Sequence, residues 1–223
     1  MKNENRKIKL KSSDLFKLSD LRNSLSEYNF SENFVSLRKK QMKILYTLCF
    51  LFIAPYLCAQ QTIIDFGKYK NGESWKITND GVMGGLSEGD YRFSDDGVVF
   101  SGTISLENNG GFSSYRSQFA KRDLSSFKKI IIRYRSKEYA MGFTLEMDRR
   151  WYVPYYKADL PATDWKWIEK EIIFTDFVKY NIGRKRAGTP TQKELANILR
   201  LGFISNEKKA GPFKIEVDYI KFE

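Results

Sequence analysis

The sequence predicts an all-β fold, a two-sheet antiparallel sandwich or jelly roll, for the part of the chain that follows residue 60. Two observations predict this fold. Several short stretches alternate apolar and polar residues, which places one side of an extended strand against a core. Clusters of Gly, Asn, Asp and Ser separate these stretches at intervals typical of a sandwich, and all 15 glycines lie beyond residue 60.

Four stretches show the alternation most clearly. In each of them every second residue is apolar or glycine: Val98–Leu106, Ile130–Tyr134, Met141–Met147 and Phe213–Tyr219. The turn signals between them lie at residues 94–97, 108–111 and 206–212. In the last stretch the alternation turns Ile215, Val217 and Tyr219 inward, so we expect Glu216 and Asp218 on the outer, solvated face.

One short helix is predicted near residues 189–199. Thr189 precedes Pro190, and Gln192 follows three positions after the threonine, which is the pattern of a capping box. Apolar residues then recur at helical spacing, at Leu195, at Ile198 and at Leu199. We expect this helix to pack on one end of the sandwich.

The first 59 residues have a different composition. Residues 1–41 are polar and lack a periodic apolar pattern, so we expect a disordered extension or a mis-annotated start that does not belong to the mature protein. Residues 42–59 have a basic lead-in, about 14 apolar residues from Ile44 to Leu57, and the small residue Ala59. This is the layout of a secretory signal peptide, and it is shorter than the roughly 20 residues that span a bilayer.

The signal predicts export to a periplasm or to the cell surface, with cleavage after Ala59 and no membrane span afterwards. An uncleaved signal anchor is the alternative. Translation starts either at Met1 or at Met42, because a signal normally lies at the very N-terminus. The mature protein would then be a single domain over residues 60–223.

The residue types that are missing limit the chemistry. The chain contains no histidine, and both cysteines, Cys49 and Cys58, lie inside the signal. Imidazole and thiol catalysis, and metal sites made from these ligands, are therefore excluded for the mature domain. Residues 60–223 hold 27 Lys and Arg against 22 Asp and Glu, which is an ordinary surface balance and no sign of nucleic-acid binding. We predict no cofactor, no metal site and no catalytic residue.

A carboxylate hydrolase is the remaining enzymatic alternative. It would need two carboxyl groups that face each other across a cleft. Candidates for such a pair are Asp80, Glu107, Glu146, Asp148 and Asp164. The sequence does not place any two of them together, and we expect solvated or turn-capping carboxylates.

Two glycine-rich motifs contain the first set of candidate binding residues. Three glycines within residues 81–85 require either positive φ angles or close contact with another part of the chain. The motif lacks the glycine spacing of a phosphate-binding loop, and no helical pattern follows it. The candidate binding residues of this motif are Asn79, Asp80, Met83, Gly84, Gly85 and Ser87.

The second motif follows the predicted strand 98–106. Its Asn-Asn-Gly-Gly run predicts a tight hairpin into a returning strand. A hairpin explains the asparagines and glycines but not the polar Ser114 and Arg116, which leaves room for a polar site beside the turn. The candidate binding residues here are Asn108, Asn109, Gly110, Gly111, Ser114 and Arg116.

A third candidate is an aromatic cluster. Residues 151–156 hold four aromatic side chains, and alternation would bury only some of them, so one or two should be exposed. Exposed aromatic rings stack on sugars or anchor a protein partner. The candidate binding residues are Trp151, Tyr152 and Tyr155, with packing at the rim of the core as the alternative role.

These motifs together resemble the complex I intermediate-associated protein 30 family, whose mitochondrial members act as assembly factors for NADH:ubiquinone oxidoreductase. The likeness runs from about Ile64 to Phe222. It rests on Trp75 with Asn79–Gly85 and Ser87, on Phe100-Ser-Gly102 with Ser105–Phe112, on Ser114 with Arg116, and on Gly211-Pro212-Phe213 with Glu216, Asp218 and Ile220. Ile173 departs from the family pattern, where we would expect proline.

The resemblance implies a galactose-binding-like jelly roll, similar to certain carbohydrate-binding modules, and no catalytic activity. A secretory signal is not a mitochondrial import sequence, so export and assembly of complex I are separate expectations. The leading interpretation is a non-enzymatic, chaperone-like binding module that holds a protein client or an assembly intermediate. The alternative is a carbohydrate-binding module of the cell envelope that uses the aromatic cluster.

Overall fold

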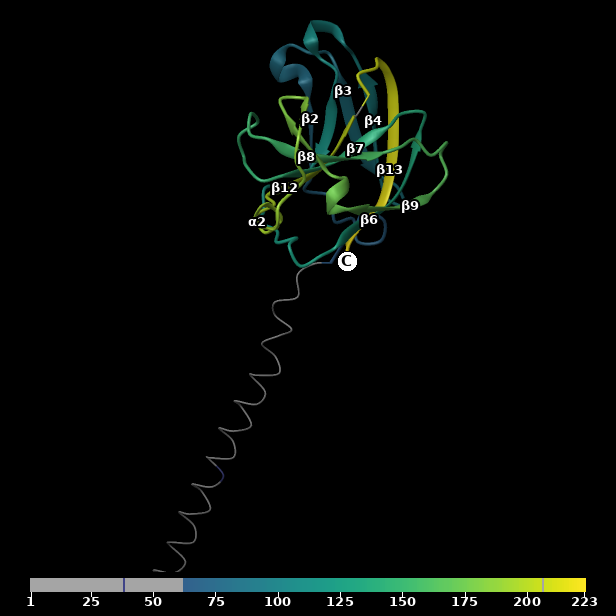
Figure 1. Ribbon diagram of the computed structural model, residues 1–223. Helices are drawn as coiled ribbons and strands as arrows, with labels where there is room; N and C mark the ends of the chain where they lie inside the picture. Colours follow the sequence, from purple (N-terminus) through teal and green to yellow (C-terminus); the bar gives the residue numbers. More distant parts are fainter. Residues whose placement is uncertain (1–37, 39–61, 206) are drawn as a thin grey trace, which may run out of the picture. The chain divides into compact units, whose positions relative to one another are not determined.

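Strands dominate the computed structural model, which describes residues 38, 62–205 and 207–223 (Figure 1). The strands are β1 Ile63–Asp65, β2 Lys76–Asn79, β3 Glu88–Phe93, β4 Val98–Ile104, β5 Ser113–Arg116, β6 Lys129–Lys137, β7 Met141–Glu146, β8 Tyr155–Leu160, β9 Ile168–Ile173, β10 Val178–Asn181, β11 Arg184–Arg186, β12 Arg200–Ser205 and β13 Gly211–Phe222. The helical segments are η2 Asp80–Met83, η3 Glu107–Asn109, η4 Phe174–Asp176 and α2 Gln192–Leu195. The predicted signal, residues 42–59, lies outside the described residues, as does the preceding extension apart from residue 38.

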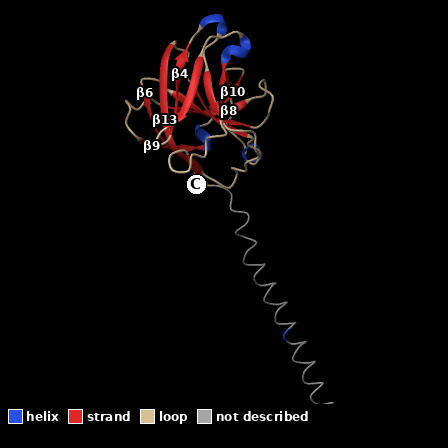
Figure 2. Cartoon of the chain, turned by 180° about the vertical axis from the view of Figure 1, so that it is seen from behind, coloured by secondary structure: helices blue, strands red, loops and turns tan. Residues whose placement is uncertain are grey.

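The strands form two antiparallel sheets. The six-stranded sheet, sheet A, has the order β3-β4-β13-β6-β9, and β1 also pairs with β13. The seven-stranded sheet, sheet B, has the order β11-β10-β8-β7-β12-β5-β2. Strand β13 is the long yellow strand in Figure 1, and from behind it lies between β4 and β6 (Figure 2). The predicted all-β jelly-roll sandwich is confirmed.

The core consists of the inner faces of the two sheets. Phe100 and Ile132 of sheet A and Phe143 and Phe203 of sheet B are all fully buried. Trp75, just before β2, closes one end of the core, where its ring centroid lies 6.0 Å from that of Phe203 in a stacked arrangement. Burial of such side chains contributes about 1.5–3 kcal/mol each to folding, so packing stabilises this cysteine-poor domain.

Alternation predicted the strands well but failed at the end of β13. The register between β13 and β6 shifts between Val217 and Tyr219, which marks a β-bulge. The bulge turns Ile220 and Phe222 inward, and the hydroxyl of Tyr219 donates instead to Glu169 on the outer face of sheet A. The prediction that Tyr219 faces the core is therefore wrong, because an inserted residue changes which side chains face inward.

The Asn-Asn-Gly-Gly run does not form the expected hairpin. Strand β4 belongs to sheet A and β5 to sheet B, where β5 pairs with β2 and β12. The connection crosses from one sheet to the other through η3, with Asn108 and Asn109 at φ angles of 52° and 59°. Local turn chemistry cannot distinguish the two topologies, because asparagine adopts the left-handed region in both.

The predicted helix is shorter and begins two residues later than expected. Thr191 caps α2, and its capping box uses Glu194 rather than Gln192. The helix ends at Leu195, and Ile198 pairs with Arg122 as an isolated bridge. The Thr-x-x-Glu pattern of Thr191 and Glu194 forms the cap in place of the predicted Thr-x-x-Gln pattern. The helix ends after one turn because the following residues pair with another segment of the chain.

Candidate functional site

The two glycine-rich motifs meet at one end of the sandwich, where η2 and η3 lie (Figure 2). A buried carboxylate, Asp80, joins them. Its Oδ1 accepts a hydrogen bond from the backbone N–H of Ser87 at 3.0 Å, and its Oδ2 accepts from the Ser87 hydroxyl at 2.6 Å. The same Oδ2 accepts from the backbone N–H of Gly111 at 2.6 Å and of Phe112 at 3.1 Å. We call this arrangement the Asp80 junction.

The Asp80 junction holds a charged carboxylate inside the protein. Burial raises the pKa of Asp80, but the hydrogen bonds from Ser87, Gly111 and Phe112 outweigh burial and hold this pKa below its ordinary value. A carboxylate with three or more N–H and O–H donors is stable in its ionised form at neutral pH. Asp80 therefore acts as a fixed acceptor that fastens the second motif to the first.

The junction also explains several glycines of the motifs. Gly84 has a φ of 84°, a left-handed conformation that favours glycine. A Cβ on Gly85 would lie 2.3 Å from Cγ of Asp80, and one on Gly110 would lie 2.7 Å from its Oδ2. Larger residues would push the carboxylate out of place. Gly81 has no such neighbour within 4 Å, so the expected steric reason does not apply to it.

Most of the other predicted motif residues contact the protein itself. The side chain of Asn79 accepts from the Ser113 hydroxyl at 2.6 Å, and the Asn108 amide donates to the carbonyl of Gly84 at 3.0 Å. The buried Ser114 hydroxyl donates to the carbonyl of Thr78 at 3.0 Å. The side chain of Asn109 is exposed, and that of Met83 lies outside what the structure describes.

The loops of the Asp80 junction expose two leucines that sequence reasoning missed. The side chains of Leu86 and Leu106 are 55% and 45% exposed. They lie on adjacent loops, because the neighbouring Ser87 hydroxyl accepts a hydrogen bond from the backbone N–H of Ser105 at 3.1 Å. A leucine flanked by Gly85 and Ser87 was a signal in the sequence, since an apolar residue in a glycine-rich turn has no strand face to join.

Arg116 lies apart from these loops, on the outer face of sheet B. Its Nη1 is 3.7 Å from Oε1 of Glu146, whose Oε2 accepts a hydrogen bond from Nε of Arg200 at 2.9 Å. These three side chains, the arginine cluster, come from β5, β7 and β12. All are largely shielded, with 19%, 14% and 17% of the side chains of Arg116, Glu146 and Arg200 exposed.

In the aromatic cluster, two rings are exposed on a loop and the third lies on strand β8. Trp151 and Tyr152, on the β7–β8 loop, are 68% and 49% exposed, and their rings meet edge to face at 5.9 Å. The expected exposure of one or two of these rings is confirmed. Tyr155 is half-buried and stacks on Tyr180 of β10, with ring centroids 5.9 Å apart.

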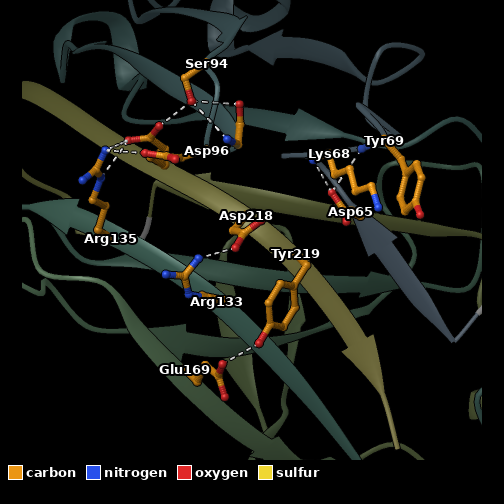
Figure 3. Close-up of polar contacts among 12 residues, drawn as sticks. Asp65, Lys68, Tyr69, Ser94, Asp96, Arg133, Arg135, Glu169, Asp218 and Tyr219 are labelled. Carbon is orange, nitrogen blue, oxygen red and sulfur yellow. Dashed lines mark hydrogen bonds and ion pairs between the residues drawn. The ribbon is translucent and has the colours of Figure 1, made fainter.

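The outer face of sheet A carries charges that pair with one another (Figure 3). Glu216 is buried, and it accepts from Nε of Arg135 at 2.8 Å and from the Ser94 hydroxyl at 2.5 Å. Arg133 forms an ion pair with Asp218 beside it (Figure 3). We expected simple solvation of Glu216 and Asp218. Their outward direction is confirmed, but Glu216 pairs with Arg135 and Ser94, and Asp218 pairs with Arg133.

Two tryptophans cover these arginines. The guanidinium of Arg135 lies 4.7 Å from the ring centre of Trp165 and 4.5 Å from that of Trp167. Lys214 lies 4.4 Å from the Trp165 ring. Such cation–π contacts add to the ion pairs and hold the side chains flat on the sheet. This face is a structural surface whose donors and acceptors match.

Metal-ligand clusters and membrane-spanning helices are both absent from the described residues. Residues 38, 62–205 and 207–223 contain no group of three or more Asp, Glu, His or Cys side chains placed to hold a metal ion. In the same residues no helix is long and apolar enough to cross a bilayer.

Comparisons with known proteins agree with this fold. A family profile described as complex I intermediate-associated protein 30 matches residues 64–217. A search of curated proteins found no match. A family 11 carbohydrate-binding module of the cellulase Lic26A-Cel5E from Clostridium thermocellum has 16% identity and a TM-score of 0.50, with 72% of this chain and 95% of that chain covered.

Two further solved structures are similar. The family 11 module of Clostridium thermocellum in complex with a mixed-linked β-1,3-1,4 tetrasaccharide has 14% identity and a TM-score of 0.49, over 71% of this chain and 95% of that one. TmCBM61 in complex with β-1,4-galactotriose has 10% identity and a TM-score of 0.35, over 72% and 99%. At these identities only the module with a TM-score of 0.50 bears on the fold, and it agrees with a β-sandwich.

Proposed function

Because the chain belongs to the complex I intermediate-associated protein 30 family, we propose that it is a non-enzymatic binding module that holds a protein client or an assembly intermediate. The family match covers most of the described domain and favours this role. The carboxylates Asp80 and Glu146, two candidates for hydrolysis, both accept hydrogen bonds from the protein, which also favours binding over catalysis.

The observation that carries this proposal is the pair of exposed leucines at the Asp80 junction. Leu86 and Leu106 stand on adjacent loops that a buried carboxylate fastens together. Apolar side chains on rigid loops lose little entropy when a partner covers them, so they are suited to anchor an interface. The polar motif residues would act indirectly, by holding the two leucines in place.

The test is a partner-capture experiment with a matched control. The double variant Leu86→Ser/Leu106→Ser removes the apolar pair, whereas Ile173→Ser removes an equally exposed apolar side chain, 50% exposed, from the far edge of sheet A. We expect a specific protein to co-purify with the wild type and with Ile173→Ser, and to be lost from the double variant. Equal recovery with all three proteins, or no recovered protein, would contradict the proposal.

A second candidate function is carbohydrate binding through Trp151, Tyr152 and Tyr155. Two large aromatic rings that are 68% and 49% exposed favour it, since sugar rings stack on such surfaces. The fold shared with the family 11 carbohydrate-binding module is a reason to test sugars. The charged neighbours Asp148 and Arg150, which pair at 2.7 Å, hold the loop that carries the rings.

A glycan array with aromatic variants tests this second candidate. Trp151→Ala should lower the affinity for a bound glycan by about ten-fold or more, as loss of an anchor residue does. Tyr69→Ala is the control, because Tyr69 is 63% exposed at another place in the chain. If the array shows no binding, or if both variants bind as the wild type does, the aromatic cluster is not a sugar platform.

We also propose that the protein is exported and acts in a periplasm or at the cell surface. The signal-like composition of residues 42–59 supports this. N-terminal sequencing of the protein purified from cells should find Gln60 as the first residue. A sequence that starts at Met1 would contradict cleavage and the proposed address.

A further inference from the structure

We propose that the outer face of sheet B binds a carboxylate-bearing sugar, with Arg116 as the residue that holds the carboxylate. This inference deepens the carbohydrate candidate and rests on it. It adds a chemical class of ligand, an acidic oligosaccharide, and it extends the site from Tyr155 across the sheet to the arginine cluster.

The first observation is that Arg116 is only weakly paired within the described residues. A guanidinium carries five N–H donors. Within the described part of the chain Arg116 donates no hydrogen bond, and its one ion pair, to Glu146, is 3.7 Å long. Only 19% of its side chain is exposed, so water has limited access. Burial lowers the pKa of Arg116, and the nearby Glu146 offsets this lowering only in part.

The second observation is an excess of arginine around one carboxylate. Glu146 accepts its hydrogen bonds from Arg200, at 2.9 Å from Nε, which leaves Arg116 with the weaker contact. Arg149 adds a third guanidinium, 5.0 Å from the ring centre of Phe119, and Arg200 lies 4.2 Å from the same ring. A planar anion that can bind an arginine fork would balance this charge.

The third observation is that small residues, Gly202 and Thr144, lie between Arg116 and Lys157 on the outer face of sheet B. In the sheet register Arg116 faces Gly202, Gly202 faces Thr144, and Thr144 faces Lys157. A Cβ on Gly202 would lie 3.0 Å from Cγ of Arg116, and one on Gly142 would lie 2.7 Å from Cδ of Lys157. The two long stems therefore lie flat on glycines. Three strand spacings separate Arg116 and Lys157, about 14 Å.

Two aromatic rings, those of Tyr155 and Tyr180, lie beside these small residues. Tyr155 is adjacent to Tyr156, which pairs with Leu145, so Tyr155 lies on the same outer face as Glu146. Its ring stacks on Tyr180, and Nζ of Lys157 lies 4.2 Å from the Tyr180 ring centre. Cationic groups and two tyrosine rings thus share one face of the sheet with Asp159, whose charge interacts with Lys157.

An acidic sugar matches all of these groups. Its carboxylate would accept two hydrogen bonds from Arg116, and its hydroxyls would donate to Glu146, which can only accept. The C–H face of its ring would pack on Tyr155. Inorganic phosphate or sulfate has no ring for the tyrosines, and a dianion would be repelled by Glu146. The chemistry of the face therefore favours a sugar carboxylate over a simple anion.

The experiment compares matched ligands on the full chain by calorimetry. The probes are an oligogalacturonate, the neutral galactose oligosaccharide of the same length and linkage, and inorganic phosphate. We expect the acidic oligosaccharide to bind at least about ten-fold more tightly than the neutral one. Arg116→Met should remove this preference, and Arg116→Lys should restore only part of it, because lysine cannot form the fork.

Arg92→Met is the matched control, because Arg92 is exposed on β3 of the other sheet and should leave binding unchanged. Thermal melts of each variant separate loss of binding from loss of folding. Equal binding of acidic and neutral sugars overturns this inference but leaves the carbohydrate candidate standing. If neither sugar binds, this inference is overturned, and the glycan array decides separately whether the carbohydrate candidate holds. If inorganic phosphate binds as tightly as the acidic sugar, or if Arg116→Met keeps the preference, the inference is also overturned.

Discussion

The outer faces of the two sheets both pair arginine with glutamate, but the number of arginines for each glutamate differs. On sheet A Arg135 binds Glu216 and also lies 3.8 Å from Asp96, and the Ser94 hydroxyl donates to the remaining Glu216 oxygen. On sheet B Arg116 shares Glu146 with Arg200, and the hydrogen bonds go to Arg200. Buried ionic groups are retained where they are fully hydrogen-bonded, or where a ligand completes them.

This difference teaches how to distinguish a structural charge cluster from a binding site. Where donors and acceptors match within the protein, a change in either partner should cost stability. Where a donor lacks a partner, its removal should cost little stability and should affect binding instead. The Asp80 junction is the most complete cluster of the first kind, since one carboxylate serves four donors.

We expect the largest effect from Asp80→Ala. This change leaves the buried N–H groups of Ser87, Gly111 and Phe112 without an acceptor, so the free energy of unfolding should fall by about 3–5 kcal/mol. Urea denaturation followed by circular dichroism measures it. Asp90→Ala on β3 is the control, because Asp90 is exposed and should change stability by less than about 0.5 kcal/mol. Similar losses for both variants would show that the junction is not a structural fastening.

The next largest effect should come from Arg135→Met on sheet A. The methionine keeps much of the apolar stem but leaves Glu216, whose side chain is 3% exposed, with only the Ser94 hydroxyl. An unpaired buried carboxylate should lower the free energy of unfolding by about 2–3 kcal/mol. The same denaturation measurement applies, and an unchanged midpoint would contradict the matched-cluster interpretation of this face.

The free energy of unfolding should depend on pH because Asp80 is ionised in the folded protein. Its pKa is lowered in the folded protein, so the ionised group stabilises the fold above its ordinary value of 3.8, and this contribution is lost as the pH falls through the folded value. Between pH 4 and pH 2 the wild type should lose stability more steeply than Asp80→Asn. One carboxyl changes the slope by at most about 1.4 kcal/mol per pH unit. Equal slopes would mean that Asp80 does not titrate as described.

The smallest effect on stability should come from Arg116→Met on sheet B. Because Arg116 makes no hydrogen bond within the described residues, its replacement should change the free energy of unfolding by less than about 0.5 kcal/mol. The contrast with Arg135→Met, the same substitution on the other face, is the sharpest form of the comparison. A loss as large as that of Arg135→Met would make the arginine cluster a structural one.

Much of the fold could be predicted because strand alternation is local. The four predicted stretches correspond to β4, β6, β7 and β13. What could not be predicted depends on partners that are distant in the sequence. The bulge after Val217 reverses the direction of Tyr219, and the crossing between β4 and β5 replaces a hairpin. Neither leaves a local pattern, since the same residues suit both arrangements.

The candidate site was only partly predictable for the same reason. Composition marked Asp80 and the glycines as unusual, but their role follows from contacts between loops 31 residues apart in the chain. Exposure of one or two rings among residues 151–156 was expected, but which rings are exposed was not. The weak pairing of Arg116 was not, because a side chain's hydrogen bonds depend on which strands become neighbours.

The sequence by itself determined the residue types available for chemistry, the all-β class and the family, because composition, alternation and motifs are properties of the chain. The tertiary structure alone decided which charges find partners. Asp80 and Arg116 both lie in motifs that the sequence singled out. Packing supplies Asp80 with four donors, whereas Arg116 has only a 3.7 Å ion pair within the described residues. The cost of burying a polar group depends on its neighbours in space, and sheet order sets those neighbours.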